Sequence, residues 1–206
     1  MGVGALHMTA YYFVNRLNAA RPPSAFWNLW TPLDDAIPGL PWTWPFYWAL
    51  YPYLTLGAAW VVWRLPSRAF RRAILAYGGM SLVGAAIQLA VPATAPWPAN
   101  ASSAQTLLHG QSWVKPYACL PSMHVALSTL TASLAVLVLG SRPLRILYVV
   151  TATLICLSTL TLREHYLLDV VAGGLLAGVT VLWWSSSTAA SRAASPRLGR
   201  PQVVPD

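Results

Sequence analysis

Long uninterrupted apolar segments alternate with short polar ones along most of the chain. Runs of roughly 20 apolar residues, the length that crosses the hydrocarbon layer as a helix, recur along it. They lie at about 42–63, 73–91, 123–140, 146–162 and 166–184. Pro45 and Pro52 fall inside the first run and predict kinks there. Because a backbone in lipid must satisfy its own hydrogen bonds, the pattern predicts an all-α, multi-pass membrane helix bundle with about five transmembrane helices.

The two ends of the chain follow other patterns. Residues 1–30 mix apolar and aromatic positions with Arg16 and Arg21, which predicts an N-terminal amphipathic interfacial helix at the membrane surface. Residues 185–206 are low in complexity and predict a disordered cytoplasmic tail. The membrane domain is therefore expected over residues 31–184.

Arginines between the apolar runs predict the orientation of the bundle. They occur between the first and second runs, between the third and fourth, and in the tail: Arg64, Arg68, Arg71, Arg72, Arg142, Arg145, Arg192, Arg197 and Arg200. With five spans these segments lie on one side, which the positive-inside rule makes cytoplasmic. The loop at 92–121 and the junction at 162–165 are then expected on the extracytoplasmic side of the cell membrane. Arg16 and Arg21 also fall on that side and disagree with the rule.

Composition supports a membrane protein and argues against other classes. Of 206 residues, 56% are hydrophobic and 9% charged, with a net charge of +8. Because the arginines are spread between apolar runs rather than gathered in a patch, we expect no nucleic-acid partner. Cys119 and Cys156 are too few for a disulfide framework.

Ionisable residues within apolar segments mark a candidate site. Asp169 falls in the last run, where an ionised carboxylate needs a polar partner. His165 lies four residues before it, so on a helix the carboxylate could fix the tautomer of the imidazole and raise the nucleophilicity of its other nitrogen. His124 opens the third run at the same predicted level. Ser122 stands at the N-terminal end of that helix, where backbone N–H groups favour an anion.

With the cations Arg163 and Lys115, these residues predict a phosphate site. Each has a simpler interpretation alone: a histidine at a helix end is often structural, and Arg163 with Glu164 could form a solvated turn. The predicted topology favours the site because it brings all of them to one side of the membrane.

Two segments resemble the signature motifs of a known family. "CLPSMH" at 119–124 and "STLTLREHYLLDVVAG" at 158–173 resemble the second and third motifs of the type 2 phosphatidic acid phosphatase superfamily. The closer resemblance is to the branch with inositol phosphorylceramide synthases and bacterial integral membrane lipid phosphatases. It implies that His165 attacks phosphorus, Asp169 orients it, His124 protonates the leaving oxygen and Ser122 contacts the phosphate.

Other positions match the family less closely. Ser158 matches the serine that begins the third motif, but Thr159 stands in place of the usual arginine. Arg163 occupies a position that is often basic in this branch, which implies phosphate binding. The first motif is not recognisable, since Trp97 stands where a basic residue is expected, and Lys115 is the candidate substitute.

The residues favour a covalent mechanism without metal or cofactor. A two-metal phosphatase needs several carboxylates, and only Glu164 and Asp169 lie near the predicted site. We predict hydrolysis or transfer of the phosphoryl group of a polyprenyl, glycerolipid or sphingolipid phosphate through a phosphohistidine. Water and an alcohol acceptor both stay open, as does the oligomeric state. The alternative is a non-catalytic lipid-phosphate binder or small anion transporter.

Overall fold

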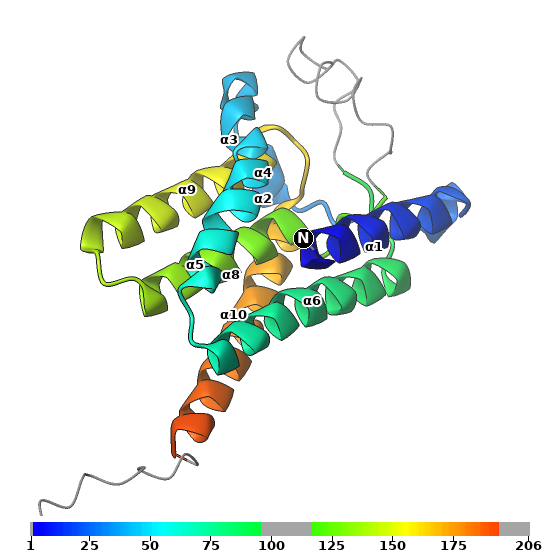
Figure 1. Ribbon diagram of the computed structural model, residues 1–206. Coiled ribbons are helices and arrows are strands. Elements are labelled where there is room, and N and C mark those ends of the chain that lie inside the picture. The colour runs from blue at the N-terminus through cyan, green and yellow to red at the C-terminus, as the bar shows by residue number, and fades with distance from the viewer. Residues whose placement is uncertain (1, 96–116, 194–206) are drawn as a thin grey trace, which may run out of the picture.

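The computed structural model describes residues 2–95 and 117–193 (Figure 1). Within these residues the regular elements are helices, with one isolated bridge between Trp27 and Ala93. The all-α prediction is therefore confirmed for the described part of the chain.

Three helices are long and apolar enough to cross a membrane. They are α6 (Ser67–Ala90), α9 (Arg142–Thr161) and α10 (Leu167–Ala193), with mean hydropathies of 1.6, 1.7 and 1.8 in their best windows. Helix α8 (Met123–Val138) has 16 residues and is shorter than a typical span. The described chain thus has three candidate membrane spans, in agreement with a multi-pass protein, whereas five spans were predicted.

The first predicted span is an interrupted helix. It consists of α3 (Trp44–Trp48), α4 (Leu50–Pro52), the π-helix η3 (Tyr53–Ala58) and α5 (Ala59–Trp63). The change to the wider π winding comes directly after Pro52, whose ring and missing N–H disturb regular α-helix. The short 3₁₀-helix η2 (Pro41–Thr43) precedes the series.

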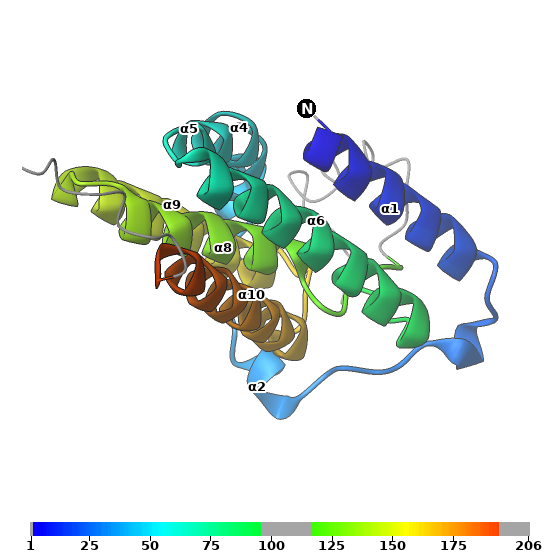
Figure 2. The same ribbon diagram turned by 60° about the horizontal axis from the view of Figure 1, so that its bottom comes forward.

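The N-terminal helix is shorter than predicted and packs along α6 (Figure 2). Helix α1 (Gly2–Ala19) ends before two prolines, and only the 3₁₀-helix η1 (Pro23–Ala25) and irregular chain follow up to residue 30. The Asn18 side chain donates hydrogen bonds to Gln88 O at 3.0 Å and to Tyr117 O at 2.7 Å. These polar contacts fix the C-terminal end of α1 to that of α6.

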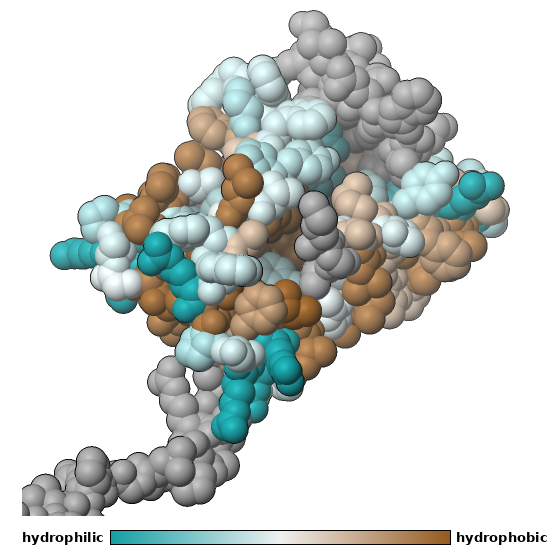
Figure 3. Space-filling view, viewed as in Figure 1, coloured by the Kyte–Doolittle hydropathy of each residue, from teal (hydrophilic) through white to brown (hydrophobic). Residues whose placement is uncertain are grey.

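Helix α8 forms the centre of the bundle. Its buried side chains, among them Ala126, Leu130 and Leu134, belong to one hydrophobic core shared with α5, α6, α9 and α10. The outer faces of the long helices carry exposed apolar side chains, among them Leu75, Leu147 and Leu175, and brown apolar patches lie among paler residues in Figure 3. An apolar outer surface around a close-packed core is expected of helices that contact lipid.

The end of α10 lies beyond its predicted boundary. The helix continues through residues 185–193, which the sequence assigned to a disordered tail. Residues 194–206 lie outside the described part of the chain.

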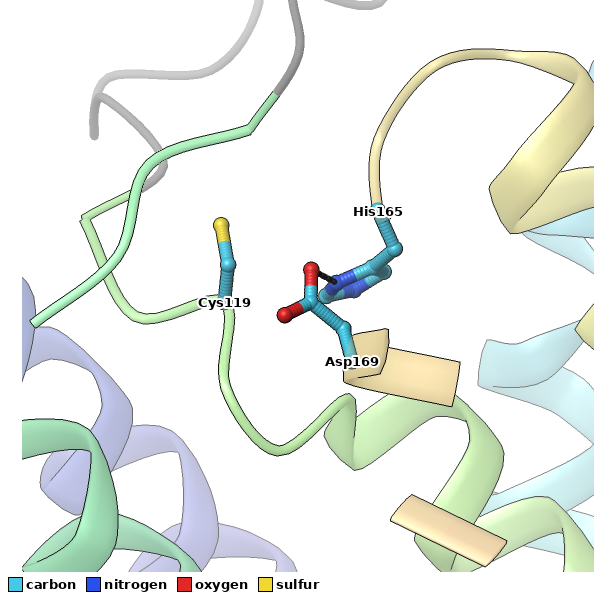
Figure 4. A group of neighbouring side chains, drawn as sticks. All are labelled: Cys119, His165 and Asp169. Atoms are coloured by element: carbon cyan, nitrogen blue, oxygen red, sulfur yellow. Dashed lines mark hydrogen bonds and ion pairs between the residues drawn. The ribbon is translucent and has the colours of Figure 1, made fainter. Parts of the chain in front are cut away.

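Three helix ends define the site. Helices α8 and α10 begin there and α9 ends there, so the loops at 117–122 and 162–166 lie side by side (Figure 4). Helix α9 has 20 residues and is about 30 Å long. Its first-turn residues Arg142 and Arg145 therefore lie at the opposite end of the bundle, about one hydrocarbon thickness from the site.

Candidate active site

His165 and Asp169 form a hydrogen-bonded pair at the start of α10. His165 Nδ1 lies 3.2 Å from Asp169 Oδ2, and the two residues are 7% and 0% exposed. The Tyr166 N–H donates to the same carboxylate oxygen at 3.0 Å. When Asp169 is ionised, Nδ1 carries the proton and the lone pair lies on Nε2, which is the arrangement of a nucleophilic imidazole.

His124 lies beside this pair, as the sequence predicted. The centroids of the His124 and His165 rings are 5.7 Å apart in an edge-to-face arrangement. Tyr47 of α3 stacks on the His124 ring, with centroids 4.6 Å apart. The interrupted helix therefore supplies a wall of the site and fixes the second imidazole.

Ser122 is the N-cap of α8 and is fully buried. Its Oγ accepts a hydrogen bond from the Val125 N–H at 3.4 Å, and its own N–H donates to Asp169 O at 3.0 Å. This backbone contact joins the start of α8 to the first turn of α10, and so places His124 next to His165.

Gly173 permits that contact, and the sequence analysis did not single it out. A Cβ at Gly173 would lie 2.4 Å from Ser122 O, far inside van der Waals contact, whereas one at Gly174 would meet nothing within 4 Å. The glycine pair that follows Asp169 in the sequence was the available signal. Glycine at 173 is thus required for the close approach of α8 and α10.

The turn between α9 and α10 is a Schellman motif with Arg163 in the left-handed conformation. Arg163 has φ 61°. The Arg163 N–H donates to Leu160 O and the Glu164 N–H to Thr159 O, both at 3.0 Å. A non-glycine residue in this conformation costs roughly 1–2 kcal/mol, so side-chain contacts must offset the strain.

The Arg163 guanidinium contacts the segment around α2 (Pro32–Asp35). Its Nη1 donates to Asp34 O at 2.7 Å and its Nη2 to Ile37 O at 2.8 Å. Two of its five N–H groups are therefore used by backbone carbonyls. The sequence predicted a phosphate clamp at this position, whereas these contacts favour a positioning role for the side chain.

Asp34 connects the same segment to α10, and the sequence analysis assigned it no role. Its Oδ1 accepts from the Leu167 N–H at 2.7 Å, and its Oδ2 from the backbone and hydroxyl of Thr31 at 2.8 and 2.7 Å. Burial raises the pKa of Asp34, but these hydrogen bonds and the charge of Arg163 outweigh it, so the pKa lies below its ordinary value. The carboxylate thus caps the N-terminus of α10 just after His165.

Other predicted residues have varied surroundings. The Ser158 hydroxyl is buried and donates to Ile155 O of its own helix at 2.7 Å. Glu164 is 9% exposed, so the solvated surface residue that the sequence suggested is in fact buried. Lys115 and Trp97 lie outside the described residues.

A third side chain, Cys119, lies beside the pair. Donor atoms of Cys119, His165 and Asp169 all lie within 4.8 Å of one another (Figure 4). Burial, with the carboxylates of Asp169 and Glu164, raises the pKa of the Cys119 thiol well above its ordinary value. The sulfur, nitrogen and oxygen atoms of these three side chains could bind a metal ion. The His165–Asp169 pair alone could instead act as an oriented imidazole.

One comparison with known proteins gives a match. A family model described as "PAP2 superfamily" matches residues 26–183 and so covers the site with all the helices that form it. No curated protein and no solved structure matches the chain.

Proposed function

The chain belongs to the PAP2 superfamily, and from this premise we propose that it hydrolyses or transfers the phosphoryl group of a lipid phosphate through a phosphohistidine at His165. Membership supports phosphatase or phosphotransferase activity on a phosphate ester. The apolar outer faces of α6, α9 and α10 support a substrate that also resides in the bilayer.

One observation carries the proposal: an oriented imidazole lies beside a second imidazole. His165 Nδ1 is 3.2 Å from the Asp169 carboxylate, and the His124 ring lies 5.7 Å from the His165 ring. In the first step, Nε2 of His165 attacks phosphorus and the P–O bond to the lipid breaks. The Asp169 carboxylate stabilises the positive charge that develops on the ring.

His124 serves as acid and then as base. It gives a proton to the leaving oxygen in the first step, and in the second it takes one from the acceptor that attacks the phosphohistidine. When the acceptor is water, phosphate is released. When it is an alcohol, the phosphoryl group is transferred.

The phosphate charge requires donors from the chain. We assign this role to Ser122 with the backbone at the N-terminus of α8, and to Lys115 and Ser158 as further candidates. Arg163 positions His165, because its guanidinium holds the turn before α10 against the α2 segment. This chemistry needs neither a metal ion nor a cofactor.

Finer assignments rest on the motifs and on the arginine pattern. "CLPSMH" and the basic Arg163 favour the branch that includes inositol phosphorylceramide synthases. Polyprenyl, glycerolipid and sphingolipid phosphates are the substrate classes to test. The positive-inside rule supports a site on the extracytoplasmic side.

Trapping of the covalent intermediate tests the proposal. Purified protein is incubated with a ³²P-labelled lipid phosphate or with ³²P-labelled p-nitrophenyl phosphate, quenched, and examined for acid-labile, base-stable label. We expect label in the wild type and none in His165→Ala. His124→Ala should still label with p-nitrophenyl phosphate, because that leaving group needs little protonation.

Two outcomes decide among the alternatives. Full hydrolysis by His165→Ala would refute the covalent role of His165, and binding of lipid phosphate without turnover or label would favour a non-catalytic binder. Release of free phosphate in the presence of acceptor alcohols then distinguishes hydrolysis from transfer.

A further inference from the structure

Three side chains with different donor atoms converge at the His165–Asp169 pair. Cys119 comes from the loop before α8, His165 from the turn before α10 and Asp169 from the first turn of α10 (Figure 4). One sulfur, one nitrogen and one oxygen donor lie within 4.8 Å of one another. The proposed phosphoryl transfer uses the histidine and the aspartate and gives the cysteine no task.

The second oxygen of Asp169 points independently to a ligand. Asp169 is 0% exposed, and its Oδ1 is buried and accepts no hydrogen bond from the described residues. A buried carboxylate oxygen without a donor is costly, because it has lost its hydration and gained no hydrogen bond in return. A cation bound beside Oδ1 would remove that cost.

We propose that Cys119, His165 and Asp169 bind a thiophilic divalent ion, Zn²⁺ or Cd²⁺, and that the bound ion blocks the site. Thiolate, imidazole and carboxylate are the ligands that Zn²⁺ takes in proteins, whereas Mg²⁺ and Ca²⁺ prefer oxygen alone. Bonds of 2.0–2.3 Å in a tetrahedron separate these donors by about 3.3–3.6 Å. Because the present separations are no greater than 4.8 Å, a contraction of at most roughly 1.5 Å completes the site.

Coordination changes the state of all three ligands. Cys119 binds as thiolate, so one proton leaves the thiol for solvent. The carboxylate of Asp169 and a nitrogen of His165 bind the ion, so the histidine is no longer available to attack phosphorus. A water molecule or a phosphate oxygen can take the fourth position. Metal binding does not depend on the proposed function, whereas inhibition by the bound ion rests on the proposed function.

A Cd²⁺ titration tests binding without reference to activity. Metal-free protein in detergent is titrated with Cd²⁺, and the ultraviolet thiolate-to-metal charge-transfer band is recorded. Cys156 provides the matched control, because it is the second of the chain's 2 cysteines and belongs to α9, with its Sγ 3.6 Å from Ser128 Oγ of α8.

The two cysteines should differ in their effect on the charge-transfer band. We expect the wild type and Cys156→Ala to show the band, saturating at one Cd²⁺ per chain. Cys119→Ala and Cys119→Ser should show none, and Asp169→Asn should bind with at least tenfold lower affinity. Two cysteine substitutions are used because serine preserves a small polar group if alanine perturbs folding. A wild type without the band, or a band retained in both Cys119 variants, would overturn the site.

An activity measurement separates this proposal from the proposed function. Zn²⁺ should inhibit lipid-phosphate hydrolysis by the wild type and Cys156→Ala, and EDTA should reverse the inhibition. Cys119→Ala should remain active and require at least tenfold more Zn²⁺ for half-inhibition. Equal inhibition of Cys119→Ala would refute inhibition through this site while the proposed function stands. A wild type that binds Cd²⁺ but hydrolyses no lipid phosphate would refute the proposed function and leave the metal site intact.

Discussion

The two oxygens of the Asp169 carboxylate have different surroundings, and this difference sets its chemistry. Oδ2 lies 3.2 Å from His165 Nδ1 and accepts the Tyr166 N–H at 3.0 Å, whereas Oδ1 accepts no hydrogen bond from the described residues. The backbone contact fixes the position of the carboxylate in the first turn of α10. Asp169 can therefore hold the imidazole in one tautomer.

Replacement of Asp169 by Asn should reduce kcat about 10²–10⁴-fold with a small change in KM. An amide N–H facing Nδ1 favours the tautomer with the proton on Nε2, which cannot attack phosphorus. Steady-state kinetics on a lipid phosphate measure the effect. Asp35→Asn is the matched control, since Asp35 is exposed and its carboxylate accepts a hydrogen bond from Trp30 Nε1. A wild-type kcat in Asp169→Asn would refute the orienting role.

The residues that the sequence could predict are those whose positions follow from helix ends. His124 and His165 stand at the starts of the third and fifth apolar runs, which begin on the same side of the membrane in the predicted topology, and they lie together in the structure. The partners of Arg163 could not be predicted, because they are backbone carbonyls of Asp34 and Ile37, far away in sequence. Neither hydrophobic periodicity nor a local motif reports such a contact.

At the level of elements, the turn between α9 and α10 combines strain with a side-chain anchor. Arg163 has φ 61°, and its guanidinium bonds to the α2 segment at 2.7 and 2.8 Å. Hydrogen bonds from a charged donor contribute roughly 1.5–3 kcal/mol each. The two bonds therefore offset the cost of the left-handed backbone and fix His165 two residues later.

Substitution of Arg163 by glycine and by alanine should distinguish the cost of the left-handed backbone from the loss of the guanidinium contacts. Both substitutions remove the guanidinium, but glycine accepts the left-handed conformation, so Arg163→Gly should be about 1 kcal/mol more stable than Arg163→Ala. Thermal unfolding in detergent measures this difference. Both variants should lose kcat while KM changes little, because the anchor positions His165. A raised KM with unchanged kcat in both would instead support the phosphate clamp.

Helix α10 approaches α8 closely through Gly173. A Cβ there would lie 2.4 Å from Ser122 O, whose backbone cannot move without shifting the start of α8. Gly173→Ala should therefore destabilise the protein by about 1–3 kcal/mol and lower kcat, since it separates His124 from His165.

Gly174→Ala is the control for Gly173→Ala, because it adds the same methyl group to the neighbouring position of the same helix. A Cβ at Gly174 meets nothing within 4 Å, and alanine is the better helix former by up to about 1 kcal/mol. We expect unchanged or greater stability and unchanged kcat. Equal losses in the two variants, measured by thermal unfolding and steady-state kinetics, would show that helix flexibility and not the α8–α10 approach matters here.

For the whole molecule, hydrophobic runs predicted the class of fold better than the number of spans. Runs at 73–91, 146–162 and 166–184 correspond to the long helices α6, α9 and α10. The run at 42–63 is apolar throughout, but its prolines and the packing of Tyr47 on His124 make it an interrupted helix. Hydropathy reports apolar character and length, whereas the shape of a helix depends on such local contacts.

The distribution of charge over the molecule predicts which end faces the cytoplasm. The arginines at the starts of α6 and α9 lie at one end of the bundle, and His165 at the other. The positive-inside rule predicts that the arginine end is cytoplasmic and that the site lies at the extracytoplasmic end. A substrate would then be a lipid phosphate of the outer leaflet.

Single cysteines introduced into a Cys119→Ala, Cys156→Ala background can test this orientation. Asn28 precedes Leu29, which packs against Cys119 at the site end. Ser141 is the N-cap of α9 at the arginine end, and both Asn28 and Ser141 are exposed. A membrane-impermeant maleimide should label Asn28→Cys on intact cells, but Ser141→Cys only after permeabilisation, because the bilayer separates the two ends. The reversed pattern would place the site on the cytoplasmic side. In that case the substrate would belong to the inner leaflet, and the arginines between the apolar runs would not determine the topology.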